Sequence, residues 1–470
     1  MASAADMRRI LWIRNRDHRA VRSGPVQGLR QARPERCSRH PGGRIHRRLS
    51  ELGLAGPGRL AVTSGLVHLG EFCMSTPFLR RLVMPATLCL AAALSACGGG
   101  SDDDAAPPPP APPGQASGSL LSSAPVNTWS AEQIAQALSD PDSKVQSGVT
   151  PRYAVRSHRV TYVSSDKHGQ PVTASGLISV PLKPPGARSP VLSYQHATTF
   201  HDDQAPSNKV EAVEPPIVLA SLGYIVLSAD YVGFGAAKGL EHPYLTAAPS
   251  AAVVLDLLHA GQTWRQQQAV ADNGQLFLAG YSEGGYVTLA AQRAIETTGD
   301  ALRQQLQASV PGAGPYDVQA TLDAQVEAVR AYNSTLGKLF EPHRLSQAPE
   351  WVRNELRRLL LRQMVPDDAD VRYQTLFLDR YMADDQAAIA AEHSVHLGWA
   401  PAVPVYLFHG RDDRTVPYAA ATSALNTLRA AGARDISLTD CTTPDYGHLK
   451  CVPEYFRFAV ERMGRLARDL

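Results

Sequence analysis

The residue best placed to do chemistry is a serine between two glycines. Ser282 lies in a Gly-x-Ser-x-Gly pattern with Gly280 and Gly284. An apolar run at 275–279 precedes the pattern and an Ala-rich segment at 285–293 follows it, which predicts a buried strand and then a helix. A sharp strand-to-helix turn lifts a serine oxygen clear of the backbone, and flanking glycines remove side chains that would clash. The pattern therefore predicts a nucleophilic Ser282, and an ordinary Gly-rich turn is the alternative.

A serine hydroxyl needs two partners before it becomes a strong nucleophile. A histidine must accept its proton, and a carboxylate must hold that histidine in place. Downstream, a predicted strand from Pro404 runs into a polar loop that carries Asp412 and Asp413, and beyond them the chain has one histidine, His448. We therefore predict His448 as the base, with a surface-loop histidine as the alternative. One of the two aspartates could serve only to cap the helix expected from Tyr418.

Strand and helix patterns alternate through most of the chain. This alternation predicts an α/β fold with a mostly parallel sheet and helices on both faces. Ligands collect at the carboxyl edge of such sheets, so we expect Ser282, the Asp413 loop and the His448 loop to meet there. The predicted strands are an antiparallel pair at 153–163 and 172–180, then strands near Val191, Tyr224, Leu276, Ala308, Val405 and Ile436.

The alternation stops over about 80 residues, between Tyr316 and Trp399. This segment is mainly helical in character, and 350–364 carries apolar residues on one stripe. We predict a helical insertion at about 317–399. Its apolar stripe could line a substrate pocket or simply pack on the core.

Five short motifs, in order along the chain, resemble those of serine α/β-hydrolases from about residue 157 to residue 470. In the family's His-Gly-x-x-Asp-x-x-Val-Pro signature the acid falls on Asp413, which favours it over Asp412. The overall similarity is to secretory lipases and their bacterial esterase relatives. The motifs are Gln195-His-Ala-Thr-Thr199, Asp230-Tyr-Val-Gly-Phe-Gly235, His242-Pro-Tyr-Leu245, Gly280-Tyr-Ser-Glu-Gly-Gly285 and His409-Gly-Arg-Asp-Asp413.

The resemblance implies an α/β-hydrolase fold in which the helical insertion forms a cap. It also implies hydrolysis of carboxylic esters through an acyl-enzyme on Ser282, with Asp413 and His448 completing the triad, and with no metal and no organic cofactor. The expected partner is a small-molecule or lipid ester. Two alternatives stay open: a peptidase of the same fold, and a surface-binding lipoprotein without catalysis.

The same resemblance implies an oxyanion hole made of two backbone N–H groups. One belongs to Glu283, the residue after the nucleophile, and the other to the turn after the strand at 190–195. Relatives usually carry glycine in that turn where this chain has Ala197, so the second donor is Ala197 or Thr198. The charge on Glu283 is unusual at this position. Its side chain could bind a substrate group, face solvent or form a salt bridge.

The N-terminal quarter is predicted to lie outside the enzyme. Residues 1–73 hold 14 arginines, no lysine and five acids, which suggests an untranslated or disordered extension, or else a nucleic-acid-binding arm. Residues 74–97 have the charged start and short apolar core of an export signal. Its end resembles a lipobox with Cys97 as the lipidated residue, and cleavage without lipidation is the alternative. Residues 98–125 are predicted to be a linker before a domain at 126–470.

An exported, lipid-anchored protein would lie at the outer membrane; one cleaved without lipidation would be secreted. Residues 98–470 hold 30 Lys and Arg against 39 Asp and Glu, a net charge of −9, which speaks against a nucleic-acid partner.

Of the six cysteines, only Cys441 and Cys451 follow Cys97, and they bracket His448. We predict a disulfide between them, since an oxidising compartment permits one. Two reduced, buried cysteines are the alternative.

Overall fold

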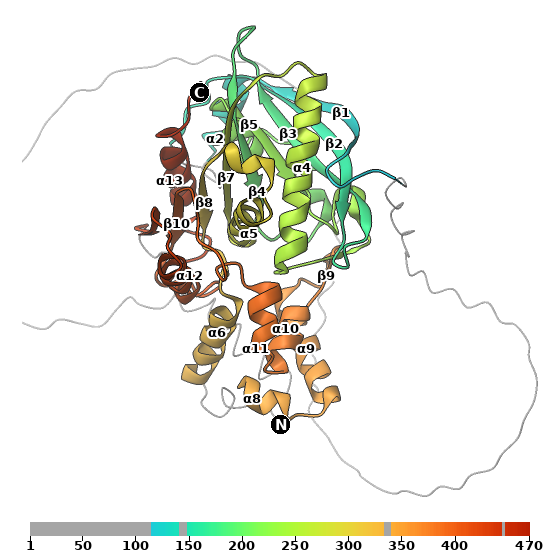
Figure 1. Cartoon of the computed structure of the whole chain (residues 1–470), viewed down its shortest axis with the longest axis vertical. Helices are drawn as coiled ribbons and strands as arrows, with labels where there is room; N and C mark the ends of the chain where they lie inside the picture. The colour runs from blue at the N-terminus through green and yellow to red at the C-terminus, as the bar shows by residue number, and fades with distance from the viewer. Residues whose placement is uncertain (1–113, 141–147, 333–339, 444–446) are drawn as a thin grey trace, which may run out of the picture. The chain divides into compact units, whose positions relative to one another are not determined.

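The computed structural model describes residues 114–140, 148–332, 340–443 and 447–470. Its centre is a nine-stranded sheet in the order β1-β2-β3-β5-β4-β7-β8-β10-β11 (Figure 1). The strands are β1 (Leu120–Trp129), β2 (Val155–Ser165), β3 (Pro171–Pro181), β4 (Ser189–Gln195), β5 (Ile225–Ala229), β7 (Asp272–Tyr281), β8 (Leu306–Gly312), β10 (Val405–His409) and β11 (Ile436–Asp440).

The sheet is antiparallel at its beginning and parallel over the rest. β1, β2, β3 and β5 pair antiparallel in that order, and every neighbour pair from β5 to β11 is parallel. The predicted antiparallel pair and the mostly parallel sheet are therefore confirmed. β1 was not predicted, and the predicted boundary between linker and domain at 125/126 falls inside it.

Helices cover both faces of the parallel part of the sheet, so β4 and β5 are buried along their whole length. Alternate residues of β7 show this, since successive side chains of a strand point to opposite faces. Leu276 and Leu278 pack with residues of α4 and α5, whereas Phe277 and Ala279 pack with residues of α3 and α13. Figure 1 shows α4 and α5 lying across the sheet. The core helices are α2 (Ala131–Leu138), α3 (Pro215–Ser221), α4 (Ala247–Gln267), α5 (Glu283–Thr297), α12 (Tyr418–Ala430) and α13 (Val452–Gly464), with 3₁₀ turns η2 (Asp202–Gln204), η3 (Gly235–Ala237) and η4 (Ala301–Gln304).

A group of helices between β8 and β10 occupies the segment where a helical insertion was expected. These helices gather at one end of the core (Figure 1). A two-stranded sheet joins the insertion to the core, because β6 (Glu241–His242) pairs in parallel with β9 (Arg372–Tyr373). The insertion comprises α6 (Val318–Tyr332), α8 (Pro342–Ser346), α9 (Glu350–Met364), α10 (Leu376–Met382), α11 (Gln386–Ala388) and the π-helix η5 (Ile389–His393).

The proposed signal segment, Cys97 and the Arg-rich extension lie outside the described residues, as does most of the predicted linker. Within the described ranges, no helix combines the length and apolar character needed to cross a membrane.

Candidate active site

Ser282 lies at the sharp turn between β7 and α5. Its backbone adopts φ 60° and ψ −122°, a region that residues with a Cβ rarely occupy. The turn is fixed on both sides, because the Ser282 N–H donates to Gly312 O at 2.8 Å and its carbonyl accepts from Tyr286 N at 3.1 Å. The strained elbow predicted from the Gly-x-Ser-x-Gly pattern is therefore present in the structure.

The glycines around the serine are required by close backbone contacts. A Cβ on Gly280 would lie 2.6 Å from Gln195 O, and a Cβ on Gly284 would overlap the same carbonyl group. A Cβ on Gly285 would overlap the carbonyl of Gly312 on β8. The end of β4 thus packs directly against the first turn of α5. Any side chain at these positions would push the elbow away from its neighbouring strands.

The three predicted catalytic residues come together in one hydrogen-bonded chain. The Ser282 hydroxyl lies 2.7 Å from His448 Nε2, and His448 Nδ1 lies 2.6 Å from Asp413 Oδ2. Asp413 can only accept when ionised, so Nδ1 carries the proton and Nε2 is left to accept from the serine. The side chains of Asp413 and His448 are 1% and 8% exposed. This arrangement can draw a proton from Ser282 and hold it on His448.

Asp413 is kept ionised by the donors that surround it. Its Oδ1 accepts hydrogen bonds from the N–H groups of Thr415 and Val416, both at 2.9 Å. Burial raises the pKa of this carboxyl, but hydrogen bonds from His409 and His448 outweigh that effect and lower the pKa to about 2. The carboxylate therefore stays charged at any pH at which His448 could act as a base.

His409 is a site residue whose role was not predicted. It is fully buried, and its Nε2 lies 3.3 Å from Asp413 Oδ2 and 2.9 Å from Val416 O. The His-Gly-x-x-Asp spacing could have identified it, because the four-residue separation lets a turn bring the two side chains together. Asp412 is exposed. The N-cap residue of the helix that follows is Pro417, and no side chain caps that helix.

The loop that carries His448 is held at both ends. Cys441, directly after β11, forms a disulfide with Cys451, directly before α13. Within the loop, the hydroxyl of Tyr281 donates to the backbone carbonyl of His448 at 2.7 Å. Because Tyr281 immediately precedes Ser282, this bond ties the His448 loop to the elbow itself.

The residues predicted for the oxyanion hole lie next to the elbow. Glu283 is the first residue of α5, so its N–H has no acceptor within the helix. Ala197 and Thr198 follow β4 and are half-buried. The turn in which they lie packs on the elbow, since a Cβ on Gly284 would come within 2.8 Å of His196 O.

The Glu283 side chain forms a buried pair with His242. His242 Nε2 lies 2.6 Å from Glu283 Oε1, and both side chains are 3% exposed. The other ring nitrogen of His242 lies 2.9 Å from Val232 O. Of the options open from sequence, solvent exposure is therefore wrong. In the sequence His242 is only one residue of a motif, because nothing local signals a contact across 41 residues.

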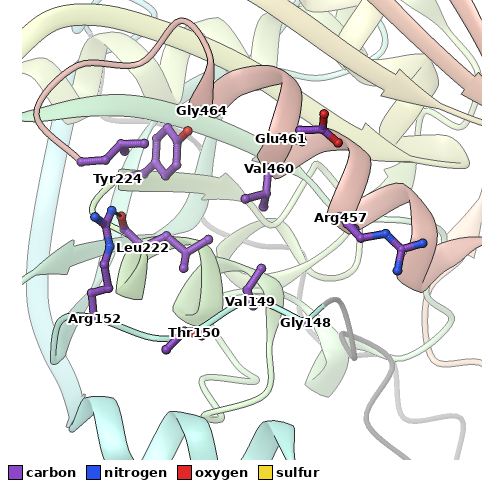
Figure 2. A pocket seen from close by; sticks show the side chains of 11 residues that line it. Gly148, Val149, Thr150, Arg152, Leu222, Tyr224, Arg457, Val460, Glu461 and Gly464 are labelled. Atoms are coloured by element: carbon purple, nitrogen blue, oxygen red, sulfur yellow. Dashed lines mark hydrogen bonds between the residues drawn. The ribbon is translucent and has the colours of Figure 1, made fainter.

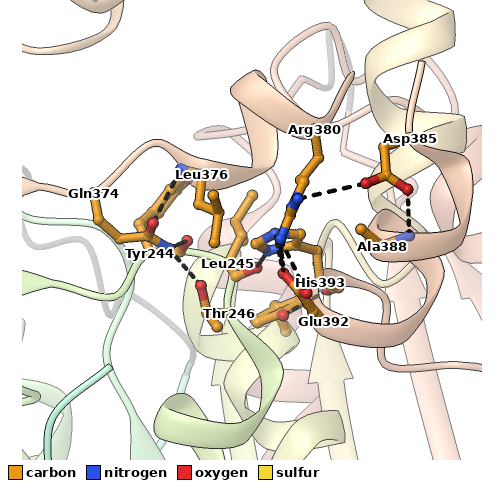
Figure 3. A network of polar contacts seen from close by, with 11 residues as sticks. Tyr244, Leu245, Thr246, Gln374, Leu376, Arg380, Asp385, Ala388, Glu392 and His393 are labelled. Atoms are coloured by element: carbon orange, nitrogen blue, oxygen red, sulfur yellow. Dashed lines mark hydrogen bonds and ion pairs between the residues drawn. The ribbon is translucent and has the colours of Figure 1, made fainter. Parts of the chain in front are cut away.

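Polar contacts anchor the insertion to the segment that follows His242 (Figure 3). Gln374 binds the side chain of Thr246, and His393 Nδ1 lies 2.7 Å from Leu245 O. Arg380 links the insertion's own elements, since its guanidinium lies 3.3 Å from Glu392 and 3.5 Å from Asp385. The insertion is therefore fastened to the core beside the Glu283–His242 pair.

A cavity of about 530 Å³ lies elsewhere on the core (Figure 2). It lies between α13 and the segment that leads into β2, and no residue of the triad lines it. Its lining residues are Gly148, Val149, Thr150, Arg152, Leu222, Tyr224, Arg457, Val460, Glu461, Gly464 and Leu470. In the part of the chain that the structure describes, no group of three or more His, Cys, Asp or Glu residues is arranged to hold a metal ion.

Comparison with solved structures identifies the fold. The esterase LipA of Xanthomonas oryzae, described as rice cell wall degrading, is 25% identical with a TM-score of 0.58, and the match covers 75% of this chain and all of LipA. A Legionella pneumophila protein is 23% identical with a TM-score of 0.58, over 74% of this chain and 97% of that protein. No protein-family model and no curated protein matches the chain. The α/β-hydrolase fold predicted from the sequence is confirmed.

Proposed function

We propose that this chain is a serine hydrolase that cleaves carboxylic esters through an acyl-enzyme. Ser282 attacks the acyl carbon, His448 accepts the serine proton and then donates it to the leaving alcohol, and Asp413 orients His448. Water attacks the acyl-enzyme in a second round of the same proton transfers. The observation that carries this proposal is the continuous chain of hydrogen bonds from Asp413 through His448 to Ser282.

The electrostatics of the site support the proposed roles. Ionised Asp413 lies 2.6 Å from His448 Nδ1, so it stabilises the imidazolium that forms when the serine proton arrives. The negative charge that develops on the substrate oxygen needs donors that are already in place. We assign these to the N–H of Glu283 and to the N–H of Ala197 or Thr198, because that turn packs against the elbow.

Ester hydrolysis is favoured over amide hydrolysis by the likeness to LipA, which is described as an esterase. We propose the helical insertion as a cap over the site, since it is fastened next to the elbow through β6, β9 and the contacts of Figure 3. Export remains a proposal that rests on sequence alone. It comprises a signal at 74–97, a lipid on Cys97 and an outer-membrane or secreted location.

The test is hydrolysis of p-nitrophenyl esters from acetate to palmitate, with Ser282→Ala as the control. We expect activity that the substitution lowers by at least about 10⁴-fold. The preferred chain length would report the depth of the acyl pocket. A folded protein without activity on any ester of the series would contradict the proposal, and cleavage of peptide substrates instead would point to the peptidase alternative.

A further inference from the structure

A second buried polar pair lies beside the nucleophile and has no part in the triad. Glu283 is the residue after Ser282, and its Oε1 shares a hydrogen bond of 2.6 Å with His242 Nε2. Both side chains are 3% exposed. A buried carboxylate is costly unless several donors surround it, so the number of its donors indicates what else it can bind.

The proton count of this pair follows from its geometry. The carbonyl of Val232 can only accept, so Nδ1 of His242 carries a proton and donates to it across 2.9 Å. One further proton lies between Nε2 and Glu283 Oε1, whichever of the two atoms holds it. The pair as a whole is therefore neutral, as an imidazolium with a carboxylate or as an imidazole with a carboxylic acid.

The second carboxylate oxygen of Glu283, Oε2, has no donor in the described chain. Burial, and in second place the charge of Glu283, raises the pKa of the nearby Tyr231 and Tyr373 hydroxyls. These groups donate elsewhere, to His196 O and Thr199 O. Tyr286 donates to His393 O at 2.6 Å. None of these three tyrosine hydroxyls donates to Glu283.

This unpartnered oxygen is not sealed inside the protein. Oε2 is not among the fully enclosed side-chain atoms of the described chain that lack a partner, so it keeps a small accessible surface. It belongs to the residue that follows the nucleophile and whose N–H is assigned to the oxyanion hole. A substrate held at Ser282 would therefore pass close to Glu283.

We infer that Glu283 accepts a hydrogen bond from a hydroxyl group of the ester, so that hydroxylated esters are the preferred substrates. A neutral hydroxyl is favoured over an ammonium group because the pair is already neutral, and an added positive charge would be buried without compensation. His242 acts as a positioning residue. It lies on β6, and its carbonyl accepts from Gln374 N at 3.0 Å, so the insertion holds it in place. This inference rests on the proposed ester hydrolysis.

The test measures how fast the full-length protein hydrolyses the two esters of each isosteric pair. On the acyl side, methyl 3-hydroxybutyrate is compared with methyl 3-methylbutyrate; on the alcohol side, 2-hydroxyethyl butyrate is compared with propyl butyrate. We expect the hydroxylated ester to have the higher kcat/KM by at least about tenfold in one of the two pairs. The ratio within one preparation cancels differences in the amount of active enzyme.

Three variants assign the preference to Glu283. Glu283→Met keeps the length of the side chain without an acceptor and should bring the ratio to about one. Glu283→Gln keeps an amide oxygen as acceptor, with its NH₂ facing His242, and should give an intermediate ratio. Glu211→Gln changes an exposed carboxylate and should keep the wild-type ratio.

The inference is overturned if the wild-type ratio is near one in both pairs, or if a preference survives in Glu283→Met. A preference for methyl 3-aminobutyrate over the hydroxy ester would also overturn it, since it would show an ammonium site. These outcomes differ from failure of the proposed function, in which no ester is hydrolysed or activity persists in Ser282→Ala. If Glu283→Met does not fold, the wild-type ratios and Glu283→Gln still decide the question.

Discussion

At the scale of single residues, the two neighbouring aspartates after β10 have different surroundings. Asp413 is buried and bound by His409, His448 and two backbone N–H groups, whereas Asp412 is exposed. The family-like spacing selected Asp413, and the geometry agrees with that choice. The two residues are adjacent and of the same type, so the same substitution at each compares a buried aspartate with an exposed one.

Asp413→Asn should lower kcat by about 10³–10⁴-fold, because an amide in place of the carboxylate favours the wrong tautomer of His448. Asp412→Asn should change kcat by less than about twofold. Steady-state hydrolysis of a p-nitrophenyl ester by both variants measures this. Equal losses in the two variants would contradict the assignment of the acid.

The low pKa of Asp413 also makes stability depend on pH. A carboxyl whose pKa is about 2 when folded and 3.8 when unfolded binds fewer protons in the folded state between these values. Its contribution, about 2 kcal/mol, is therefore present above pH 4 and is lost as the pH falls towards 2. Urea unfolding of the Ser282→Ala protein at pH 5, 4 and 3 should show this loss. Adding Asp413→Asn should reduce the slope, and an unchanged slope would contradict the prediction.

Sequence alone could predict the residues of the triad but not their surroundings. Ser282, Asp413 and His448 each lie in a short pattern whose spacing carries the signal. Glu283 also lies in such a pattern, yet its partner His242 is 41 residues away and is brought close only by the packing of β6 on the elbow. Contacts of that kind depend on the fold of several elements, which local patterns do not specify.

At the scale of elements, the site depends on how closely the backbone of α5 approaches β4. Gly284→Ala would place a Cβ against the carbonyl groups of Gln195 and His196. Since neither backbone group can move without shifting β4, we expect a loss of at least about 2 kcal/mol in unfolding free energy, together with most of the activity. Gly464→Ala is the control, because a Cβ there meets nothing within 4 Å. Urea unfolding of both variants tests this, and equal stabilities would count against the packing argument.

The disulfide also holds the site together at the scale of elements, because it closes the loop that carries His448. Cys441 and Cys451 are ten residues apart and enclose His448. Replacing both with serine should lower the unfolding free energy by about 3 kcal/mol, because the unfolded chain regains the freedom of that loop. It should also lower kcat, since the base is then positioned by fewer restraints. Urea unfolding and steady-state kinetics of the double variant measure both effects. Wild-type stability in the double variant would contradict the loop-closure argument.

At the scale of the whole molecule, the α/β-hydrolase fold begins earlier than the sequence indicates. The segment Leu120–Trp129 was not predicted to be a strand because it alternates weakly and contains a proline. Such features are typical of an edge strand. In the structure this strand pairs with the edge of β2. It also forms hydrogen bonds with residues that are distant in the sequence. Trp264, almost completely buried, donates to Ser123 at 2.8 Å, and Asn127 donates to Val210 O at 2.7 Å.

Truncation distinguishes a strand from a linker. A chain that begins at residue 114 should keep the stability and activity of the longer protein. A chain that begins at residue 130 should lose about 1–3 kcal/mol of unfolding free energy, because the buried indole N–H of Trp264 loses its acceptor. It should also aggregate more readily, since the N–H and C=O groups along β2 become an open edge. Urea unfolding and size-exclusion chromatography of the two chains measure these effects. Equal stability would mean that β1 is dispensable and that the fold is complete without it.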